Sequence, residues 1–529
     1  MGSMDYIWLG ILSVFQGPEL FSVLGLPVSV TLVMIFSGFL LGIVVGATPG
    51  LAGPIAMAIA LPILISTFGY TPDALLPVMG FLIGVMKGAT LGGAVPAILF
   101  NTPGTPDAFM TTLDGYPMTR NGRAKKALRV AHFSSVSGDT FSDVVLIVCA
   151  PFLALLVEGY LDLPEKTALL ILSLSFIAAV IGGSAAKGLI SVGLGLLAVF
   201  IGTGEDFYPR LSLGSEELSR GFPIATAILG ILIVSAVFKE LEALWLEKRR
   251  SGAIAVTPES GDQRLHLSDI RRLFPYIARS SVIGTAIGAL PGIGSTLAAT
   301  LGYTIGRGRY EKRKAPDDPD FGKGAPEGVA ATEAANSSVS GANLIPVLSL
   351  GIPGNAAAVF LILAADSIGG FNPGPSVFRF TTDTVNPELV IAFGLFTSMF
   401  VANALNWTVG GVLMRSMGVM IRVPKQILLP VVLLLTLTAI YVQETRMVAI
   451  WFTLGFGVLG YLMRSLGISP LPFVIAFILG GKLEENARQA FAATGGDPFF
   501  LFTHPIALVF MLLSVAVIVW SARKPRDRE

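Results

Sequence analysis

The sequence predicts an all-α polytopic membrane protein with two inverted-topology repeats, re-entrant hairpins, broken helices and about 11–13 membrane segments. Three observations support this prediction: an apolar composition, a repeated Pro-Gly pattern and an uneven distribution of Lys and Arg. Of the 529 residues, 53% are hydrophobic and only 13% are charged, whereas a soluble domain carries about 25% charged residues. Several apolar runs approach the roughly 20 residues that span a bilayer core; examples are residues 26–45, 222–238, 427–442, 448–463 and 505–520.

The remaining composition narrows the class of protein further. The chain holds 60 glycines and 33 prolines, and in lipid a broken helix survives only where it faces protein or a water-lined cavity. A simple membrane anchor would not need so many breaks. A single cysteine, Cys149, excludes a disulfide framework, and three widely spaced histidines give no indication of a metal site or cofactor. The net charge of +1 gives no indication of nucleic acid, and residues 1–25 lack the basic segment of a cleavable signal.

Two Pro-Gly elements occur twice in the same order. Residues 46–53 read GATPGLAG, and residues 288–294 read GALPGIG. Further along each half, residues 96–104 read PAILFNTPG and residues 346–354 read PVLSLGIPG. The two pairs have nearly the same spacing, which predicts an internal repeat, although apolar sequence rich in Gly and Pro can also resemble itself by chance.

The basic residues then orient the two halves, because Lys and Arg near helix ends prefer the cytoplasmic side. No Lys or Arg precedes Lys87, so both flanks of the first break are expected outside, whereas both flanks of the second are basic (residues 239–279 and 307–314). The loops after the later pair of breaks show the opposite bias: residues 120–129 hold five basic residues, and residues 355–388 hold only Arg379. Equivalent pieces therefore face opposite sides, as in the inverted repeats of many secondary transporters.

This orientation gives a predicted domain organisation. Residues 1–238 form the first inverted repeat with an N-terminal helix, and residues 239–279 form a cytoplasmic linker. Residues 280–504 form the second inverted repeat, and residues 505–529 form a C-terminal transmembrane helix with a basic tail. The N-terminus is expected outside and the C-terminus in the cytoplasm.

The helix breaks are the predicted binding site. Residues 288–303 are too short to cross the membrane twice, so a re-entrant hairpin bent at Pro291-Gly292 is expected, with a mirror hairpin near Thr48. A helix that starts after such a turn presents free N–H groups that suit a carboxylate, and freed carbonyls can hold Na⁺. The predicted substrate-binding residues are Thr48, Pro49, Gly50, Asn101, Thr102, Pro103, Gly104, Thr105, Pro291, Gly292, Gly294, Ser295, Thr296, Gly351, Pro353, Gly354 and Asn355. The alternative is that their small side chains only permit close helix packing.

Ionisable residues inside apolar stretches are further candidates, because burying a charge in a membrane is costly. Lys87 either offers positive charge to an anion or snorkels to an interface. Glu333 and Asn336 lie three residues apart and share a helix face. They either meet a coupling cation or hydrogen-bond across helices. Lys87, Glu333 and Asn336 are therefore possible substrate- or ion-binding residues.

At these motifs the chain resembles the large membrane subunit of the tripartite tricarboxylate transporters. The resemblance covers nearly the whole chain, and the residues that carry it read GATPG (46–50), NTPGTP (101–106), LDGYP (113–117), PEGVAA (326–331), EAAN (333–336), LGIPG (350–354) and LEEN (483–486). One departure is Lys87, where an aromatic or small residue is expected, and it leaves open which carboxylate is carried.

The resemblance implies a multi-pass protein of the bacterial inner membrane in a three-part uptake system. A periplasmic solute-binding protein delivers a small carboxylate, and a small membrane subunit accompanies the large one. Uptake is expected to follow an ion gradient, with Na⁺ as the expected coupling ion and H⁺ as the alternative. The absence of a Walker motif agrees with secondary transport.

Three other classes of protein are alternatives to a transporter. A membrane enzyme would need convergent titratable groups, which the apolar stretches hardly supply, so no catalytic residue is predicted. A passive organic-anion channel is the main alternative, because helix ends can also line a pore. A scaffold without transport activity would not need four paired helix breaks.

Overall fold

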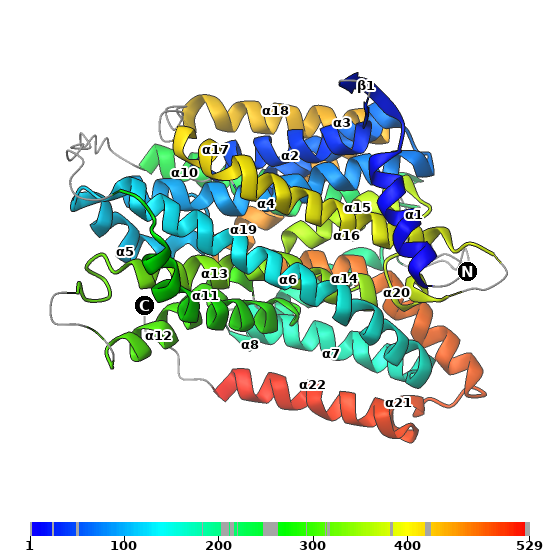
Figure 1. The fold of residues 1–529 in the computed structure, drawn as a ribbon. Helices are drawn as coiled ribbons and strands as arrows, with labels where there is room; N and C mark the ends of the chain where they lie inside the picture. Colours follow the sequence, from blue (N-terminus) through cyan, green and yellow to red (C-terminus); the bar gives the residue numbers. More distant parts are fainter. Residues whose placement is uncertain are drawn as a thin grey trace. The chain divides into compact units, whose positions relative to one another are not determined.

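The computed structural model describes residues 3–23, 26–48, 52–181, 184–202, 211, 216–219, 221–246, 263–292, 294–312, 314, 318–380, 384–417 and 425–523. Within these residues, the elements are helices apart from one two-stranded antiparallel sheet. The first part of the chain forms α1 (Ser3–Phe15), β1 (Glu19–Val23), β2 (Leu26–Ser29), α2 (Val30–Gly46), α3 (Gly53–Phe68), α4 (Pro72–Phe100), η1 (Pro106–Ala108), α5 (Phe109–Arg120), α6 (Ala124–Tyr160), α7 (Leu163–Ile181), α8 (Ala185–Val199), η2 (Glu216–Leu218), α9 (Ile224–Leu229), η3 (Gly230–Val234) and α10 (Ser235–Leu246) (Figure 1).

The second part repeats this order of helices and breaks. It forms α11 (Leu267–Gly288), α12 (Gly294–Tyr310), α13 (Pro326–Ala342), α14 (Leu344–Leu350), α15 (Ala356–Ile368), η4 (Pro375–Phe378), α16 (Pro387–Leu405), η5 (Asn406–Gly410), α17 (Gly411–Ser416), α18 (Lys425–Glu444), α19 (Met447–Ser465), α20 (Leu471–Ala493), α21 (Phe500–Thr503) and α22 (Pro505–Arg523). Both halves begin with a helical hairpin, α2 and α3 or α11 and α12. The second break of each half then follows, after α4 in the first half and after α13 and α14 in the second.

The described helices fit a polytopic membrane protein. Seven of them are long and apolar enough to cross a membrane, and six shorter helices are also apolar. Together, the seven long and six shorter apolar helices agree with the expected 11–13 segments. The structure confirms the all-α polytopic fold class.

The chain folds into two compact units, which are described separately. Unit 1 comprises residues 1–154, 249–290 and 294–425, and unit 2 comprises residues 155–248, 291–293 and 426–529. Both units draw on both halves of the sequence, so they do not coincide with the predicted domains. The predicted boundaries at residues 238, 279 and 504 stay a prediction.

Within unit 1, α2 and α4 lie side by side at very short range (Figure 1). A Cβ atom added at Gly38 would lie 2.1 Å from the carbonyl oxygen of Phe81, one at Gly42 would lie 2.4 Å from that of Val85, and one at Gly46 would lie 2.2 Å from that of Ala89. The contacts advance by four residues on both helices, so α2 and α4 run parallel. Small residues at this spacing let membrane helices approach closely.

The second half repeats this packing with α11 and α13. A Cβ atom added at Gly284 would lie 2.2 Å from the carbonyl oxygen of Ala335, and one at Gly288 would lie 3.0 Å from that of Val339. These contacts also advance by four residues, so α11 and α13 are parallel like α2 and α4. The sequence repeat is therefore a structural repeat as well.

This close approach gives a stability prediction. Gly42→Ala should destabilise the protein by about 1–3 kcal/mol, because the new methyl group meets backbone atoms of α4 that cannot give way. The measurement is the unfolding temperature of the purified protein in detergent. Gly193→Ala on α8 is the matched control, since a Cβ there meets nothing within 4 Å. An equal unfolding temperature for both variants would contradict this account of the interface.

The two ends of unit 1 show that the halves are inverted. At one end, here called the basic end, Lys126 binds Asp269 with Nζ and Oδ2 3.0 Å apart, and Arg272 pairs with Glu327. The start of α11 and the start of α13 therefore lie at the basic end. At the opposite end, Tyr6 donates to the carbonyl of Thr384 at 3.4 Å, and Gly370 lies against Pro72, the first residue of α4. Equivalent helices α4 and α13 thus begin at opposite ends.

The halves also exchange equivalent packing partners. Helix α15 of the second half packs on α3 and α4 of the first, and α5 of the first half packs on α12 and α13 of the second. Since α5 and α15 each follow the second break of their half, the exchange is reciprocal. This pairing is the expected result of an approximate twofold relation between inverted halves.

Unit 2 is a second helical bundle. Helix α7 packs against α8, α20 and α22, and α19 packs against α9, η3 and α10. Arg464 of α19 donates from Nε to Ser235 Oγ at 3.0 Å and from Nη2 to the carbonyl of Leu232 at 3.2 Å. Ser521 Oγ near the end of α22 donates to the carbonyl of Ala179 at 2.7 Å. These polar contacts tie the later helices of both halves into one bundle.

Candidate functional site

The later breaks of the two halves have the same backbone geometry. Asn101, which caps the C-terminus of α4, has φ 53° and ψ 29°, and Gly351, which caps that of α14, has φ 70° and ψ 22°. In the first half the N–H of Thr102 donates to the carbonyl of Pro96 at 3.2 Å, and in the second the N–H of Ile352 donates to that of Pro346 at 3.1 Å. A left-handed residue followed by such a bond is a common way to end a helix.

In each half the later break packs against the helix that precedes it, and in the first half it also contacts the first helix of the hairpin. A Cβ atom added at Gly104 would lie 2.3 Å from the carbonyl oxygen of Gly46 and 3.0 Å from Cα of Gly93. The equivalent position in the second half, Gly354, lies against the side chain of Asn343 at the junction of α13 and α14. The last turn of the hairpin's first helix and the later break therefore lie together in the first half.

The first-half break also contacts the second half directly. Thr296 Oγ1, in the first turn of α12, donates to Asp107 Oδ1 of η1 at 2.7 Å. One turn further, Thr111 Oγ1 of α5 donates to Glu333 Oε1 of α13. Glu333 is fully buried, and its second oxygen, Oε2, has no hydrogen-bond partner. Residues from both halves thus converge beside the break at 101–105.

The predicted polar residues fall into two groups. Three already bond to backbone: Thr48 Oγ1 donates to the carbonyl of Val44 at 2.9 Å, Thr102 Oγ1 donates to that of Phe100 at 3.2 Å, and Asn355 Oδ1 caps α15 by accepting from the N–H of Ala358 at 2.8 Å. These contacts agree with the alternative of a local structural role. Thr296 instead reaches the other half, and Ser295 precedes it in the first turn of α12.

The remaining predicted residues shape the backbone of the breaks. Pro291 and Gly292, which has φ 87°, lie in the turn after α11, and Gly294, the first residue of α12, has φ 76°. Thr105, Gly104, Pro353 and Gly354 are buried, and Pro103 is half-buried. Pro49 and Gly50 lie outside the described residues. The binding roles assigned to this whole set stay predictions.

The structure places Lys87 inside unit 1. Its side chain is fully buried, and Nζ lies 2.7 Å from Asp139 Oδ1 and 2.6 Å from Asp143 Oδ2. Lys87 therefore does not snorkel to an interface, because two buried carboxylates hold its ammonium group inside unit 1. Its charge is paired with both carboxylates, and its role towards a substrate or coupling ion stays a prediction.

Sequence reasoning missed the two aspartates that bind Lys87. Asp139 and Asp143 are four residues apart in α6, which otherwise continues as an apolar helix to Tyr160. Two acidic residues at this spacing share one helix face, and acidic residues inside a membrane helix are candidates by default. That signal was sufficient to single them out.

Asn336 and one acidic residue near the basic end, Asp114, complete the polar contacts. Asn336 is buried on α13, one turn after Glu333. Asp114 Oδ1 accepts hydrogen bonds from the N–H groups of Gly322 at 2.9 Å, Gly324 at 2.9 Å and Ala325 at 2.8 Å. Asp114 therefore anchors the segment that leads into α13.

The basic end itself is exposed and strongly charged. A cavity of about 370 Å³ there is lined by Arg271, Arg272, Pro275, Tyr276, Arg309, Tyr310, Asp318 and Glu327. In the adjoining loop, hydrogen bonds from the Lys314 and Lys323 ammonium groups lower the pKa of Asp320 to about 2. This carboxylate stays ionised throughout the physiological pH range.

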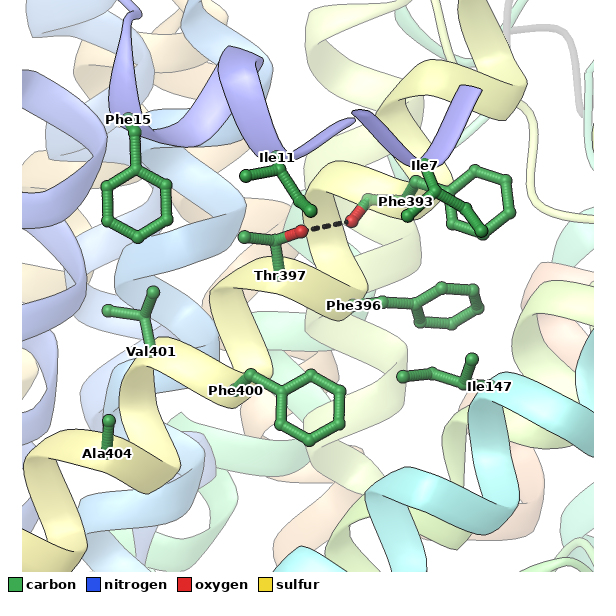
Figure 2. Close-up of a pocket in the computed structure, with 10 residues that line it drawn as sticks. All are labelled: Ile7, Ile11, Phe15, Ile147, Phe393, Phe396, Thr397, Phe400, Val401 and Ala404. Atoms are coloured by element: carbon green, nitrogen blue, oxygen red, sulfur yellow. Dashed lines mark hydrogen bonds between the residues drawn. The ribbon is translucent and has the colours of Figure 1, made fainter. Parts of the chain in front are cut away.

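A second cavity, of about 460 Å³, is apolar (Figure 2). It lies between α1, α6 and α16 and is lined by Ile7, Ile11, Phe15, Ile147, Phe393, Phe396, Thr397, Phe400, Val401 and Ala404. Its one hydroxyl, Thr397 Oγ1, donates to the carbonyl of Phe393 at 2.8 Å, as the dashed line in Figure 2 shows. With no free donor among its lining side chains, this cavity does not suit a carboxylate.

Comparisons with known proteins gave one matching family model and two relatives. The family model described as "Tripartite tricarboxylate transporter TctA family" matches residues 32–475. An Agrobacterium vitis protein named "Uncharacterized 52.8 kDa protein in TAR-I ttuC' 3'region" is 31% identical over 507 residues, which cover 94% of this chain and 95% of that protein. Another from the same organism, "Uncharacterized protein in TAR-II ttuC' 3'region", is 30% identical over 249 residues, covering 46% of this chain and 98% of that protein. No solved structure matches the chain.

Proposed function

Because the chain belongs to the tripartite tricarboxylate transporter TctA family, we propose that it is the substrate-translocating large subunit of a secondary transporter for tricarboxylates or related small carboxylates. Membership makes it a multi-pass membrane protein of a tripartite system. The observation that supports a translocating role most is the meeting of the two inverted halves beside the break at 101–105, through Thr296 and Asp107.

The proposed substrate site uses the starts of α12 and α15. Free N–H groups in the first turn of a helix favour an anion, and α12 begins with Gly294, Ser295 and Thr296. Helix α15 begins after the break at 351–355. In this proposal one carboxylate binds between the breaks near the midplane, and one half moves against the other, by rocking or by an elevator-like slide, to expose it on either side.

A cation gradient is proposed to drive uptake, with Na⁺ held by carbonyls freed at the breaks. Transport of a multiply charged anion into a cell requires cations to offset its charge and the membrane potential. The test is uptake of radiolabelled citrate into proteoliposomes with Na⁺ outside or replaced by choline. Uptake should fall at least tenfold in choline, whereas equal uptake would remove Na⁺ from the mechanism.

The partners and the orientation are also part of the proposal. A periplasmic solute-binding protein would deliver the carboxylate to the opposite end of unit 1, and a small membrane subunit would complete the complex. The basic end would face the cytoplasm of a bacterium, because Lys and Arg prefer that side of the inner membrane. The C-terminus would then also be cytoplasmic.

The alternative function is a passive organic-anion channel. A counterflow assay distinguishes a channel from a carrier. Proteoliposomes loaded with unlabelled citrate should take up external labelled citrate faster than empty ones, because a carrier returns more quickly when loaded. A channel would show no such acceleration.

The two amides at the breaks give a prediction about affinity. Asn101→Gly keeps the left-handed backbone, and Asn355→Ser keeps a cap for α15; both remove the amide. Each variant should raise the half-saturating citrate concentration about tenfold, as expected when a hydrogen bond to a charged ligand is lost. The measurement is initial uptake rate against citrate concentration, with unfolding temperature as the control for folding. Unchanged kinetics in both variants would remove these residues from the site.

A further inference from the structure

A buried polar cluster joins four helices of unit 1. It consists of Lys87 on α4, Asp139 and Asp143 on α6, Ser340 on α13 and Asn403 on α16, and is called the Lys87 cluster below. All five residues are at least 93% buried. Ser340 Oγ donates to Asp139 Oδ1, and Asn403 Nδ2 donates to Asp143 Oδ2 at 2.7 Å. The first half contributes the three ionisable residues, and the second half contributes both neutral ones.

The charges of this cluster do not balance. One ammonium group faces two carboxylates, and among the described residues no other cation pairs with either aspartate. If all three groups were ionised, the buried cluster would carry a net charge of −1. Removing an unpaired ion from water costs several kcal/mol even after the protein relaxes. One more positive charge would make the cluster neutral.

The hydrogen bonds of the cluster also indicate that one proton is missing. Asp143 Oδ1 and Asn403 Oδ1 are both buried acceptors without a partner. Asp143 Oδ1 faces α13, where a Cβ atom added at Gly341 would lie 2.1 Å from it. A buried acceptor without a donor is unfavourable, and a carboxyl group that gains a proton becomes a donor itself.

We propose that the Lys87 cluster binds one exchangeable proton on Asp143 and that this proton is co-transported with the substrate. The proton passes from water to an Asp143 carboxylate oxygen and later returns from that oxygen to water, and no other bond changes. This inference rests on the proposed carboxylate transport and adds a site of ion coupling to it.

A proton fits this cluster better than Na⁺ does. Lys87 Nζ already lies within 2.7 Å of both carboxylates and fills the position where a metal ion would bridge them. Two other titratable groups on these helices, Glu333 and His132, have different surroundings. Glu333 on α13 accepts from Thr111 of α5, and His132 on α6 contacts the carbonyl of Asn406 at 2.9 Å.

The position of the cluster explains how a proton could control movement. With the proton bound, the cluster is neutral, and it can stay buried where α4 and α6 contact α13 and α16. Without the proton, its net negative charge favours hydration, which requires the first-half and second-half helices to separate. Proton exchange and the opening of this interface would therefore be linked.

The first test detects the proton without any substrate. Infrared spectra of the full-length protein in liposomes should show the C=O band of a protonated carboxyl group that shifts in D₂O. Asp143→Asn should abolish that band, and Asp320→Asn, in the exposed loop at the basic end, should leave it unchanged. If no carboxyl band disappears in Asp143→Asn, the proposal is overturned.

The second test measures coupling. Asp143→Asn leaves one ammonium and one carboxylate, so the cluster is neutral at every pH at which both are ionised. In proteoliposomes this variant should retain citrate counterflow but lose at least tenfold in citrate accumulation driven by an inward proton gradient, measured with equal Na⁺ concentrations on both sides of the membrane. Proton-driven accumulation equal to wild type would refute the coupling. Absence of citrate counterflow in the wild type would instead count against the proposed function, and the infrared test would still decide whether the proton is bound.

Discussion

Lys87→Met is expected to destabilise the protein by about 3–5 kcal/mol, the usual cost of breaking a buried ion pair by removing one partner. Asp139 and Asp143 are at least 97% buried and would be left facing each other without a cation. Two protons would then be needed to neutralise the two carboxylates, because the methionine side chain supplies neither a positive charge nor a hydrogen-bond donor. The measurement is the unfolding temperature and the yield of monodisperse protein in detergent.

A double substitution provides the matched control for this prediction. Lys87→Met combined with Asp139→Asn removes one charge of each sign, and a single proton on Asp143 then restores neutrality. The double variant should recover most of the stability that Lys87→Met loses. If the single and double variants unfold at the same temperature, repulsion between the two carboxylates is not the cause.

Asp114→Ala is expected to cost about 3 kcal/mol or more. Its Oδ1 atom accepts three backbone N–H bonds from residues 322, 324 and 325, and Asp114 is 1% exposed. Each buried donor left without a partner costs about 1–3 kcal/mol. The hydrogen bonds that are lost hold α5 against the segment that leads into α13, and this contact joins the two halves at the basic end.

Asp114→Asn separates hydrogen bonding from charge. Its amide oxygen can still accept the three N–H bonds, so this variant should lose less stability than Asp114→Ala. Asp320→Asn, at an exposed carboxylate, should change the unfolding temperature little, because surface ion pairs contribute little. Equal losses for Asp114→Asn and Asp114→Ala would show that charge, rather than the three hydrogen bonds, anchors this segment.

The hairpins and breaks could be predicted because their determinants are local. A Pro-Gly pair cannot continue a helix in lipid, and the pattern at 96–104 recurs at 346–354. The structure gives these two segments the same left-handed residue and the same hydrogen bond, at Asn101 and at Gly351. Their inverted placement followed from the Lys and Arg distribution, because that bias depends on the side of the membrane rather than on tertiary contacts.

The cross-helix contacts could not be predicted in the same way. Lys87 and Asp143 are 56 residues apart, and Thr111 and Glu333 are 222 apart. Such pairs depend on which helix faces meet after the halves interlock, and hydropathy does not encode that choice. The acidic spacing in α6 could have identified Asp139 and Asp143 as candidates, but not Lys87 as their partner. Likewise, nothing local predicted that Asn355 caps α15, and its role in binding stays a prediction.

Substrate protection of cysteines placed in both halves tests the central claim most directly. In a Cys149→Ser background, Thr102→Cys probes the first-half break and Ser295→Cys probes the first turn of α12. Each variant is reconstituted and labelled with a maleimide while citrate is added at increasing concentration. If one carboxylate binds between the inverted halves, citrate should slow labelling at both positions with the same half-maximal concentration. Protection in only one half, or in neither while citrate uptake persists, would contradict a shared site at the helix breaks.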